Sequence, residues 1–255
     1  MEAERLRVVI AHSERMSAKL LNFVLGDVGH EVELATGMAD ALKRTLGQET
    51  DAVLLGSEFA DGDGYTLCKE LRARRFSGPI IFVSSKGEIA AKVTAFECGA
   101  DDFVLTPFDP LELVARLHSV TQRYQQGDFQ ALGTIIRSGD VELSIADLTL
   151  RQPGRAPVVL TPTEMRLLEC LMRNVNIVIS RETLVERTWG YDFIGDSNRV
   201  DVYIRRIRKK LERVAAQPEY LHTVRGLGYI FKPPTMAGAI VDLELGNETP
   251  ARVSA

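Results

Sequence analysis

The sequence predicts a two-domain α/β chain, in which a doubly wound parallel sheet is followed by a smaller α+β domain. Three observations lead to this fold class. The first half alternates short apolar runs with amphipathic segments, a pattern typical of βαβ units. The second half contains three successive helices followed by a glycine-rich hairpin. The chain has 255 residues, more than one ordinary domain, and its 45% hydrophobic content is enough for two cores.

Five apolar or β-branched runs mark the strands of the first half. They are residues 7–11, 31–34, 52–55, 80–83 and 102–105. The amphipathic segments between and after them predict helices over residues 14–28, 38–46, 65–75, 86–97 and 109–124. Five such units predict a five-stranded parallel sheet of the flavodoxin-like kind. Any functional site would then lie at the carboxyl ends of the strands.

Two helices of the second half are marked by their N-terminal caps. Thr161 and Glu164 have the spacing of a capping box, with a proline at the first helical position, and they precede the amphipathic run 165–173. Ser180 is the expected N-cap of a second helix over residues 182–189.

The third helix, which follows Ser197, combines an apolar stripe with a row of cations. The stripe consists of Val200, Ile204, Ile207 and Leu211. The row on the other faces consists of Arg205, Arg206, Arg208, Lys209 and Lys210. A cationic helix is usually only a solvated surface. Arginine dominates this one, however, and its guanidinium group fits both phosphate oxygens and the edge of guanine. The helix is therefore expected to bind duplex DNA.

A hairpin over residues 223–231 follows this helix. Gly226 and Gly228 permit a tight turn and would leave Arg225 on the approaching strand. Three helices followed by such a hairpin form the pattern of a winged helix-turn-helix domain.

The segments LTPTEMRLLECL, RETLVERTWGYD, SNRVDVYIRRIRKKLE and HTVRGLGYIF resemble the effector domain of the OmpR/PhoB family of response regulators. The resemblance extends over about residues 135–232. It implies a four-stranded platform before the helices, for which residues 140–143, 149–150 and 158–160 supply strand signals. It also implies that the loop 190–198 is presented to RNA polymerase.

The same resemblance assigns roles toward double-stranded DNA. Arg206 would approach base edges in the major groove, and Arg225 would enter the minor groove with Thr223 beside it. Lys209 is expected to contact phosphates. The positions that would hold the DNA backbone are Arg199, Tyr203, Arg205 and Arg208.

The segment GADDFVLTPFDPLELVARL resembles a receiver domain, which in this family binds Mg²⁺ and accepts a phosphoryl group on an aspartate. His12 and Ser13 stand where the resemblance implies the metal-binding acids. Gly56 stands in place of the phosphoacceptor, and Thr106 in place of a lysine. Ser84 alone matches the family. The sequence therefore predicts a degenerate receiver with no metal site, no cofactor and no phosphoryl transfer.

Other residues do not replace this chemistry. Asp61 and Asp63 superficially resemble a calcium loop, but its remaining ligands are missing, so a solvated turn is expected. Ser57 and His12 have no visible base or phosphate cradle. No catalytic residue is expected, and the chain is not predicted to be an enzyme. Two alternatives remain, namely a vacated pocket that senses a small molecule and a phosphorelay receiver that uses an unexpected residue.

The charged face through which family members pair two receivers is kept. It comprises the fourth helix, fifth strand and fifth helix, with Lys92, Glu97, Asp101, Asp102, Glu112, Arg116 and Arg123. Any one such pair contributes only about 0 to 1 kcal/mol, but the complete set predicts a homodimer. Ser84 and Phe103 are expected to hold this face permanently in the active-like arrangement.

The expected domains are a receiver for dimerisation or input over residues 1–124, a linker over 125–133, a winged-helix domain over 134–235 and a mobile tail over 236–255. The formal net charge is −4, yet residues 129–235 hold 16 Lys and Arg against 12 Asp and Glu, as a DNA-binding domain would. Cys68, Cys98 and Cys170 are expected to be small buried apolar groups. With no membrane or secretory segment apparent, we expect a cytoplasmic transcription regulator.

Overall fold

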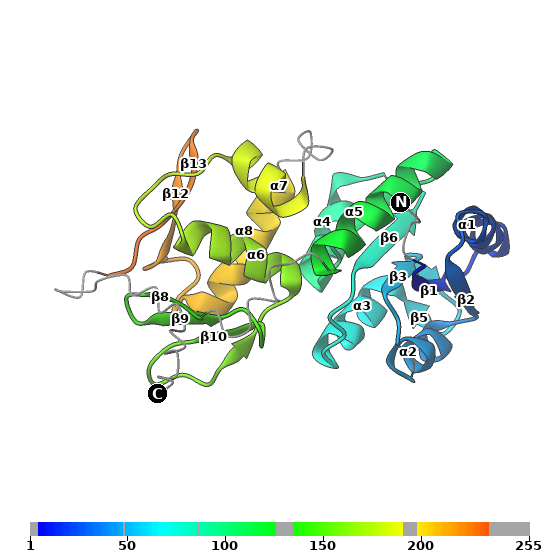
Figure 1. The fold of residues 1–255 in the computed structure, drawn as a ribbon, viewed down its shortest axis with the longest axis horizontal. Coiled ribbons are helices and arrows are strands. Elements are labelled where there is room, and N and C mark those ends of the chain that lie inside the picture. Colours follow the sequence, from blue (N-terminus) through cyan, green and yellow to red (C-terminus); the bar gives the residue numbers. More distant parts are fainter. Residues whose placement is uncertain (1–4, 48, 86, 126–134, 191–197, 235–255) are drawn as a thin grey trace, which may run out of the picture.

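The computed structural model describes residues 5–47, 49–85, 87–125, 135–190 and 198–234, which form two domains side by side (Figure 1). Apart from Gln125, the expected linker lies outside these residues, as does the expected C-terminal tail. Within the described ranges, none of the helices has the length and apolar character needed to cross a membrane.

A five-stranded parallel sheet forms the centre of the N-terminal domain. Its strands are β1 (Arg7–Ala11), β2 (Glu31–Ala35), β3 (Ala52–Leu55), β6 (Ile80–Ser84) and β7 (Asp102–Leu105). They lie in the order β2-β1-β3-β6-β7, and every pair is parallel. This confirms the predicted doubly wound sheet.

Five helices cover the two faces of this sheet (Figure 1). They are α1 (Arg15–Asp27), α2 (Met38–Gly47), α3 (Gly64–Ala73), α4 (Ile89–Cys98) and α5 (Pro110–Gln125). Helices α1 and α5 pack on one face, and α2, α3 and α4 pack on the other. Helix α4 begins three residues later than expected, because Glu88 has extended backbone and acts as the N-cap. The preceding Gly87 also disfavours a helix.

A two-stranded hairpin, β4 (Glu58–Phe59) and β5 (Gly62–Asp63), contains the two aspartates expected in a solvated turn. Asp61 accepts hydrogen bonds from the backbone N–H groups of Met38 and Ala39 at the start of α2. These bonds lower the pKa of Asp61. Asp63 is the N-cap of α3 and accepts from the N–H of Thr66. Both carboxylates therefore cap helices, a role that the sequence pattern did not suggest.

The C-terminal domain contains a four-stranded antiparallel sheet, three helices and a hairpin. The sheet has the order β11-β10-β9-β8, with β8 (Ile135–Ser138), β9 (Val141–Ser144), β10 (Thr149–Arg151) and β11 (Val158–Val159). The helices are α6 (Pro162–Met172), α7 (Arg181–Trp189) and α8 (Asn198–Leu211). The hairpin is β12 (Leu221–Val224) with β13 (Gly228–Phe231). This confirms the predicted winged helix-turn-helix fold and its platform.

The hairpin, hereafter the wing, is attached to the segment between α6 and α7. Ile179 and Tyr229 exchange two backbone hydrogen bonds. Gly228 has a φ of +149°, and a Cβ at this position would lie 2.0 Å from the carbonyl oxygen of Ile179. Only glycine permits this close approach, so the base of the wing is held rigidly against the domain.

The expected burial of the cysteines is confirmed for two of the three. Cys68 and Cys98 are buried, and burial raises the pKa of the Cys68 thiol to about 12. Cys170 is only half-buried. One continuous apolar cluster includes residues of both domains, with the rings of Phe96 and Tyr203 6.1 Å apart between them.

Candidate nucleic-acid interface

Helix α8 is anchored in its own domain by the predicted apolar stripe. Its four members, Val200, Ile204, Ile207 and Leu211, are at most 1% exposed. At the start of the helix, Asp201 pairs with Arg181 at 2.9 Å and accepts a hydrogen bond from the hydroxyl of Tyr229 at 2.6 Å. An acidic residue is favourable in the first turn of a helix. The contact also joins α7, α8 and the wing.

Half of the expected DNA contacts are exposed, namely Arg205, Lys209, Thr223 and Arg225. Arg208 links the helix to the wing, because its guanidinium donates to the carbonyl of Leu221 and to the hydroxyl of Thr223 at 2.9 and 2.8 Å. Strand β12 ends at Val224. Arg225 is therefore the first residue of the turn, and the expectation that it lies on the approaching strand is wrong.

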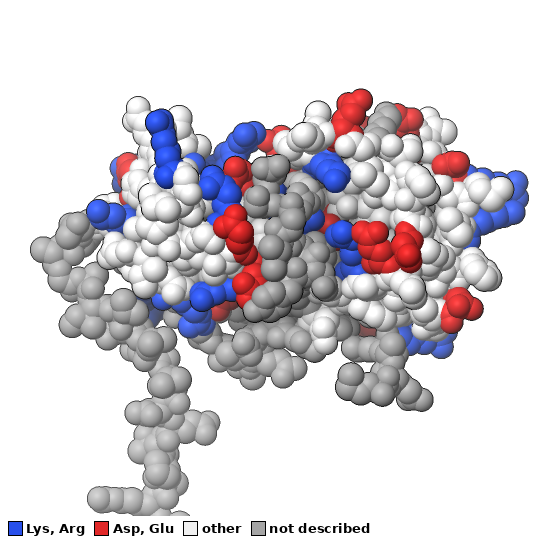
Figure 2. Space-filling model, turned by 90° about the horizontal axis from the view of Figure 1, so that it is seen from above, with Lys and Arg blue, Asp and Glu red and all other residues white. Residues whose placement is uncertain are grey.

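The surface in Figure 2 shows how these cations are distributed. On this face, blue Lys and Arg groups are separated by white and red ones over both domains, and no continuous positive patch is visible. Part of the positive charge of the C-terminal domain is instead directed at the N-terminal domain.

Helix α8 packs against α4 of the N-terminal domain. The hydroxyl of Tyr203 donates to the carbonyl oxygen of Ala100, and the guanidinium of Arg206 donates to the carbonyl oxygen of Phe96 at 2.6 Å. At the rim, Arg205 pairs with the exposed Glu97 at 2.8 Å. The helix expected to enter the major groove is thus held by the other domain.

A buried ion pair lies at the centre of this contact. Arg199 and Asp102 approach to 3.0 Å, and their side chains are 1% and 0% exposed. The guanidinium of Arg199 lies over the rings of Phe96 and Trp189, and Asp102 also pairs with Arg116 at 3.1 Å. Breaking a buried pair on one side leaves an uncompensated charge, at a cost of about 3 to 5 kcal/mol. Substitution of either partner alone is therefore expected to be costly.

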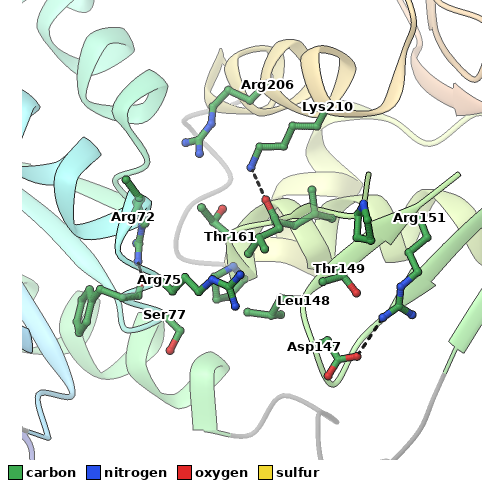
Figure 3. A pocket seen from close by; sticks show the side chains of 16 residues that line it. Arg72, Arg75, Ser77, Asp147, Leu148, Thr149, Arg151, Thr161, Arg206 and Lys210 are labelled. Atoms are coloured by element: carbon green, nitrogen blue, oxygen red, sulfur yellow. Dashed lines mark hydrogen bonds and ion pairs between the residues drawn. The ribbon is translucent and has the colours of Figure 1, made fainter. Parts of the chain in front are cut away.

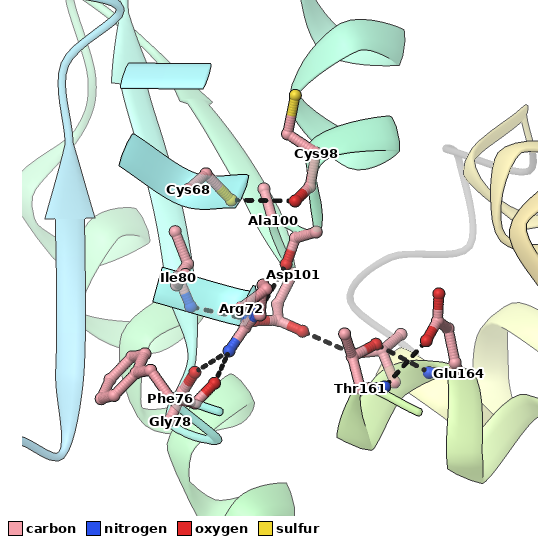
Figure 4. A network of polar contacts seen from close by, with 12 residues as sticks. Cys68, Arg72, Phe76, Gly78, Ile80, Cys98, Ala100, Asp101, Thr161 and Glu164 are labelled. Carbon is pink, nitrogen blue, oxygen red and sulfur yellow. Dashed lines mark hydrogen bonds and ion pairs between the residues drawn. The ribbon is translucent and has the colours of Figure 1, made fainter. Parts of the chain in front are cut away.

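A second polar connection joins α6 to the N-terminal domain (Figure 4). The hydroxyl of Thr163 donates to Asp101 at 2.6 Å. Asp101 also accepts from the guanidinium of Arg72 at 2.6 Å and from the backbone N–H of Ile80 at 2.9 Å. Because Asp101 is only 1% exposed, each of these donors stabilises a charge that water cannot reach.

Glu164 connects the helix cap to the cationic helix. Its carboxylate and the hydroxyl of Thr161 form the expected capping box. It is fully buried and lies 2.8 Å from Arg206 and 2.6 Å from Lys210. Burial favours the neutral acid, but the two cations outweigh it, and the pKa of Glu164 is lowered. Arg206 therefore has two acceptors within the chain and is not free to reach a base edge.

The carboxyl ends of the receiver strands hold no acidic cluster among the described residues. Gly56 directly follows β3, and a Cβ on it would lie 3.0 Å from the imidazole ring of His12. The imidazole Nδ1 accepts from the backbone N–H of Glu14, and burial lowers the pKa of His12. Ser84 is buried, with its hydroxyl 3.3 Å from that of Ser57. An imidazole thus covers the position of the expected acceptor.

A divalent cation does not fit these residues. Ser13 is exposed, Thr106 is half-buried, and neither supplies a carboxylate. Within the part of the chain that the structure describes, no three His, Cys, Asp or Glu side chains are grouped to hold a metal ion. Mg²⁺ requires hard oxygen ligands, usually carboxylates, and the residues around Gly56 are not of this kind.

Comparisons with known proteins agree with this architecture. Residues 8–118 match the family model "Response regulator receiver domain", and residues 154–231 match "Transcriptional regulatory protein, C terminal". The sensory transduction protein RegX3 of Mycobacterium tuberculosis is 36% identical over 222 residues, which cover 87% of this chain and 97% of RegX3. This chain belongs to the OmpR/PhoB-type response regulators. These are DNA-binding transcription regulators rather than enzymes.

Solved structures of two RitR variants resemble this response regulator over both domains. In one variant a serine replaces a cysteine, and this structure has a TM-score of 0.75 and 26% identity. In the other an aspartate replaces the same cysteine, and the TM-score is 0.73 at the same identity. Each match covers 90% of this chain and all of the RitR chain.

The expected dimer face of this response regulator is partly occupied within the chain. Asp101 and Asp102 are buried against the effector domain, and Glu97 pairs with Arg205. Arg116 pairs with Glu112 and Asp102. Lys92 is half-buried, and the side chain of Arg123 lies outside the described residues, as does most of the loop 190–198. In this conformation Glu97, Asp101 and Asp102 are engaged by the effector domain.

Several residues of the interface were not expected from the sequence. Thr163, Glu164 and Arg72 were known only as parts of helices, yet they bind Asp101 or Arg206. One signal is present in the sequence, because the capping box predicts a carboxylate at the start of α6. Its pairing with Arg206 depends on how α6 and α8 cross, which periodicity does not reveal.

Proposed function

We propose that this response regulator is a sequence-specific transcription regulator of the cytoplasm that works without phosphorylation. The observation that carries the proposal is the edge at Gly56, where His12 packs over the end of β3. Glycine offers no nucleophile for a phosphoryl group. His12, Ser13 and Thr106 offer neither a carboxylate for Mg²⁺ nor a lysine to neutralise the transferred charge.

The test is exposure to phosphodonors. Acetyl phosphate or beryllofluoride with Mg²⁺ should change neither the oligomeric state, measured by sedimentation velocity, nor the affinity for DNA, measured by fluorescence anisotropy. Gly56→Asp should remain equally unresponsive, because it restores the acceptor without the metal site. A Mg²⁺-dependent gain in affinity by the unmodified protein would contradict the proposal.

DNA recognition by this protein requires the two domains to separate. In the closed chain, Arg206 donates to the carbonyl of Phe96 in the receiver, and Tyr203 and Arg199 are buried. We therefore infer that the conformation that reads DNA is an open one. The observed affinity is the intrinsic affinity multiplied by the fraction of open molecules.

Dimerisation through the receiver is part of the same proposal. The face formed by α4, β7 and α5 would pair two open chains and place two effector domains on direct or inverted half-sites. Asp102 cannot bind Arg199 and a partner receiver in the same way at once, so opening would come before pairing. A contact between the loop 190–198 and RNA polymerase stays an expectation from the family.

The two alternative functions receive less support. A small-molecule sensor would need space at the vacated site, whereas the ring of His12 packs on Gly56 and Ser84 is buried beside Ser57. An unconventional phosphorelay receiver would need a nucleophile next to a metal site, and the described residues offer no such grouping.

A further inference from the structure

A cleft of about 720 Å³ lies between the two domains (Figure 3), and Gly56 is not among the residues that line it. The receiver contributes the end of α3 and the turn after it. The effector domain contributes β10, the segment around β11 and one side of α8. The cationic residues that line the cleft are Arg72, Arg75, Arg151, Arg206 and Lys210, and Asp147 is the acidic one.

The positive charge of this cleft is only partly neutralised. Arg206 and Lys210 share one carboxylate, that of Glu164. Arg75 is exposed, its side chain has no hydrogen bond or ion pair among the described residues, and in Figure 3 its guanidinium extends into the cleft. Arg72 and Arg151 are already paired, with Asp101 and with Glu142 and Asp147. The cleft therefore keeps an excess of cations.

A ligand with several acceptor oxygens would satisfy the guanidinium of Arg75, which extends into the cleft (Figure 3). The Oγ1 atom of Thr149, by contrast, is buried within the wall of the cleft and out of reach of such a ligand.

We propose that this interdomain cleft binds a small diphosphate-bearing anion, which bridges Arg75 of the receiver to Arg206 and Lys210 of the effector domain. Guanidinium and ammonium groups recognise phosphate oxygens through charge-assisted hydrogen bonds. The cleft is wide enough for a small ligand. It exists only while the domains are together, so the ligand stabilises the closed chain and opposes DNA binding.

The opposition to DNA rests on the proposed function, because it assumes that the open chain is the one that binds. A ligand that binds only the closed form multiplies the ratio of closed to open molecules by one plus the ligand concentration divided by its Kd. At 100 times its Kd, it should weaken DNA binding by up to about 100-fold. Binding of the anion itself does not depend on this assumption.

Anion binding is tested first without DNA, by thermal melting and calorimetry of the full chain with inorganic pyrophosphate. Sodium sulfate at equal ionic strength controls for general screening. Arg75→Gly removes the unpaired guanidinium at a residue with a φ of +65°, where glycine is favoured, so the fold should persist. Arg74→Ala is the matched control, because Arg74 is the neighbouring cation but does not line the cleft.

We expect pyrophosphate to raise the melting temperature of the unmodified chain and of Arg74→Ala. The affinity of Arg75→Gly for pyrophosphate should be at least tenfold lower than that of the unmodified chain. The proposal would be overturned if sulfate raised the melting temperature as much as pyrophosphate does, or if pyrophosphate did not raise it at all. It would also be overturned if Arg75→Gly bound pyrophosphate as tightly as the unmodified chain. ADP serves as a second probe. Tighter binding of ADP than of pyrophosphate would identify a nucleotide as the ligand class, and equal binding an inorganic anion.

The second stage measures DNA affinity across a pyrophosphate series at constant ionic strength. Affinity should fall for the unmodified chain and for Arg74→Ala, but change much less for Arg75→Gly. If pyrophosphate binds while DNA affinity stays constant, the link between cleft and readout is wrong. If the chain binds no duplex at all, the proposed function fails, and the melting experiment still decides whether the cleft binds the anion.

Discussion

At the scale of single residues, Arg206 has two competing sets of partners. The family resemblance directs it to a base edge, while the closed chain gives it the carbonyl of Phe96, and α6 of its own domain gives it the carboxylate of Glu164. Lys209, three residues further on, is exposed. The two cations can therefore be separated experimentally, although both belong to the same helix.

Arg206→Ala should weaken binding to the specific site by about 1 to 3 kcal/mol and affect random duplex much less. Part of that cost should be offset, because the substitution also removes contacts that keep the chain closed. Lys209→Ala should weaken both duplexes about equally and reduce the salt slope by about one unit. The measurement is anisotropy on both duplexes across a salt series. If Arg206→Ala weakens binding to the specific site and to random duplex by the same amount, Arg206 does not read a base.

Arg225→Ala should behave differently again, because an arginine in the minor groove senses groove width and A·T content. Its position at the start of the wing turn leaves the side chain exposed. The loss of affinity should be largest for operators with A·T-rich flanks and small when the flanks are G·C-rich. Equal losses on both sets of flanks would place Arg225 on the DNA backbone instead.

His30 and His118 form a second residue-scale feature, inside the receiver. Their Nε2 atoms are 3.0 Å apart, and Nδ1 of His30 accepts from the backbone N–H of Leu6. Burial, with a smaller contribution from His118, lowers the pKa of His30 below 6.5. The unfolded chain therefore binds this proton more readily. The contribution to stability is present above about pH 6.5 and is lost as the pH falls through the lowered pKa.

The melting temperature of the unmodified chain should accordingly fall between pH 7.5 and pH 5.5. His118→Gln removes the neighbouring imidazole, so its decrease should be smaller. His222→Gln in the effector domain serves as the control and should follow the unmodified chain. If all three proteins lose the same number of degrees, this histidine pair does not contribute to the acid sensitivity.

At the scale of elements, the contacts of α8 with α4 and of α6 with Asp101 hold the two domains together. The hydrogen bond from Thr163 to Asp101 connects the domains without involving any residue expected on DNA. Thr163→Val keeps the shape and deletes the donor. Since hydrogen bonds to charged groups contribute about 1.5 to 3 kcal/mol, DNA affinity should rise roughly 10- to 100-fold if closure limits binding.

Thr94→Val is the matched control for this substitution. Thr94 lies on α4, is exposed, and donates its hydroxyl to the carbonyl of Ala90 within its own helix. It should leave DNA affinity unchanged, as measured by anisotropy. If Thr163→Val also binds DNA no better than the unmodified chain, the closed contact does not limit binding.

The elements themselves could be predicted from the sequence because their signals are local. The apolar stripe of α8 and the capping box of α6 depend on residues three or four positions apart. The pair of Arg199 and Asp102 joins residues 97 positions apart, and no periodicity encodes such a contact. Asp61 shows the same limit, since the N–H groups that it caps belong to Met38 and Ala39, 23 and 22 positions earlier in the chain.

At the scale of the whole molecule, the proposed dimerisation would compete with closure for one face. Asp101, Asp102 and Glu97 serve the intramolecular contact, so the free protein should be mainly a monomer. DNA with two half-sites should recruit two chains cooperatively, because each open chain exposes its receiver face. Sedimentation velocity with and without such DNA checks this. A stable dimer in the absence of DNA would show that the receivers pair through a different surface.

The packing of α8 on α4 has a consequence for gene control. Every duplex that uses Arg206 must draw α8 away from the receiver, and the work of doing so is the same for each of them. Closure therefore lowers the affinity for all such operators by a common factor and leaves their ranking unchanged. A cell could retune the whole regulon together, through the abundance of the protein or the tightness of this one contact, while every operator keeps its sequence.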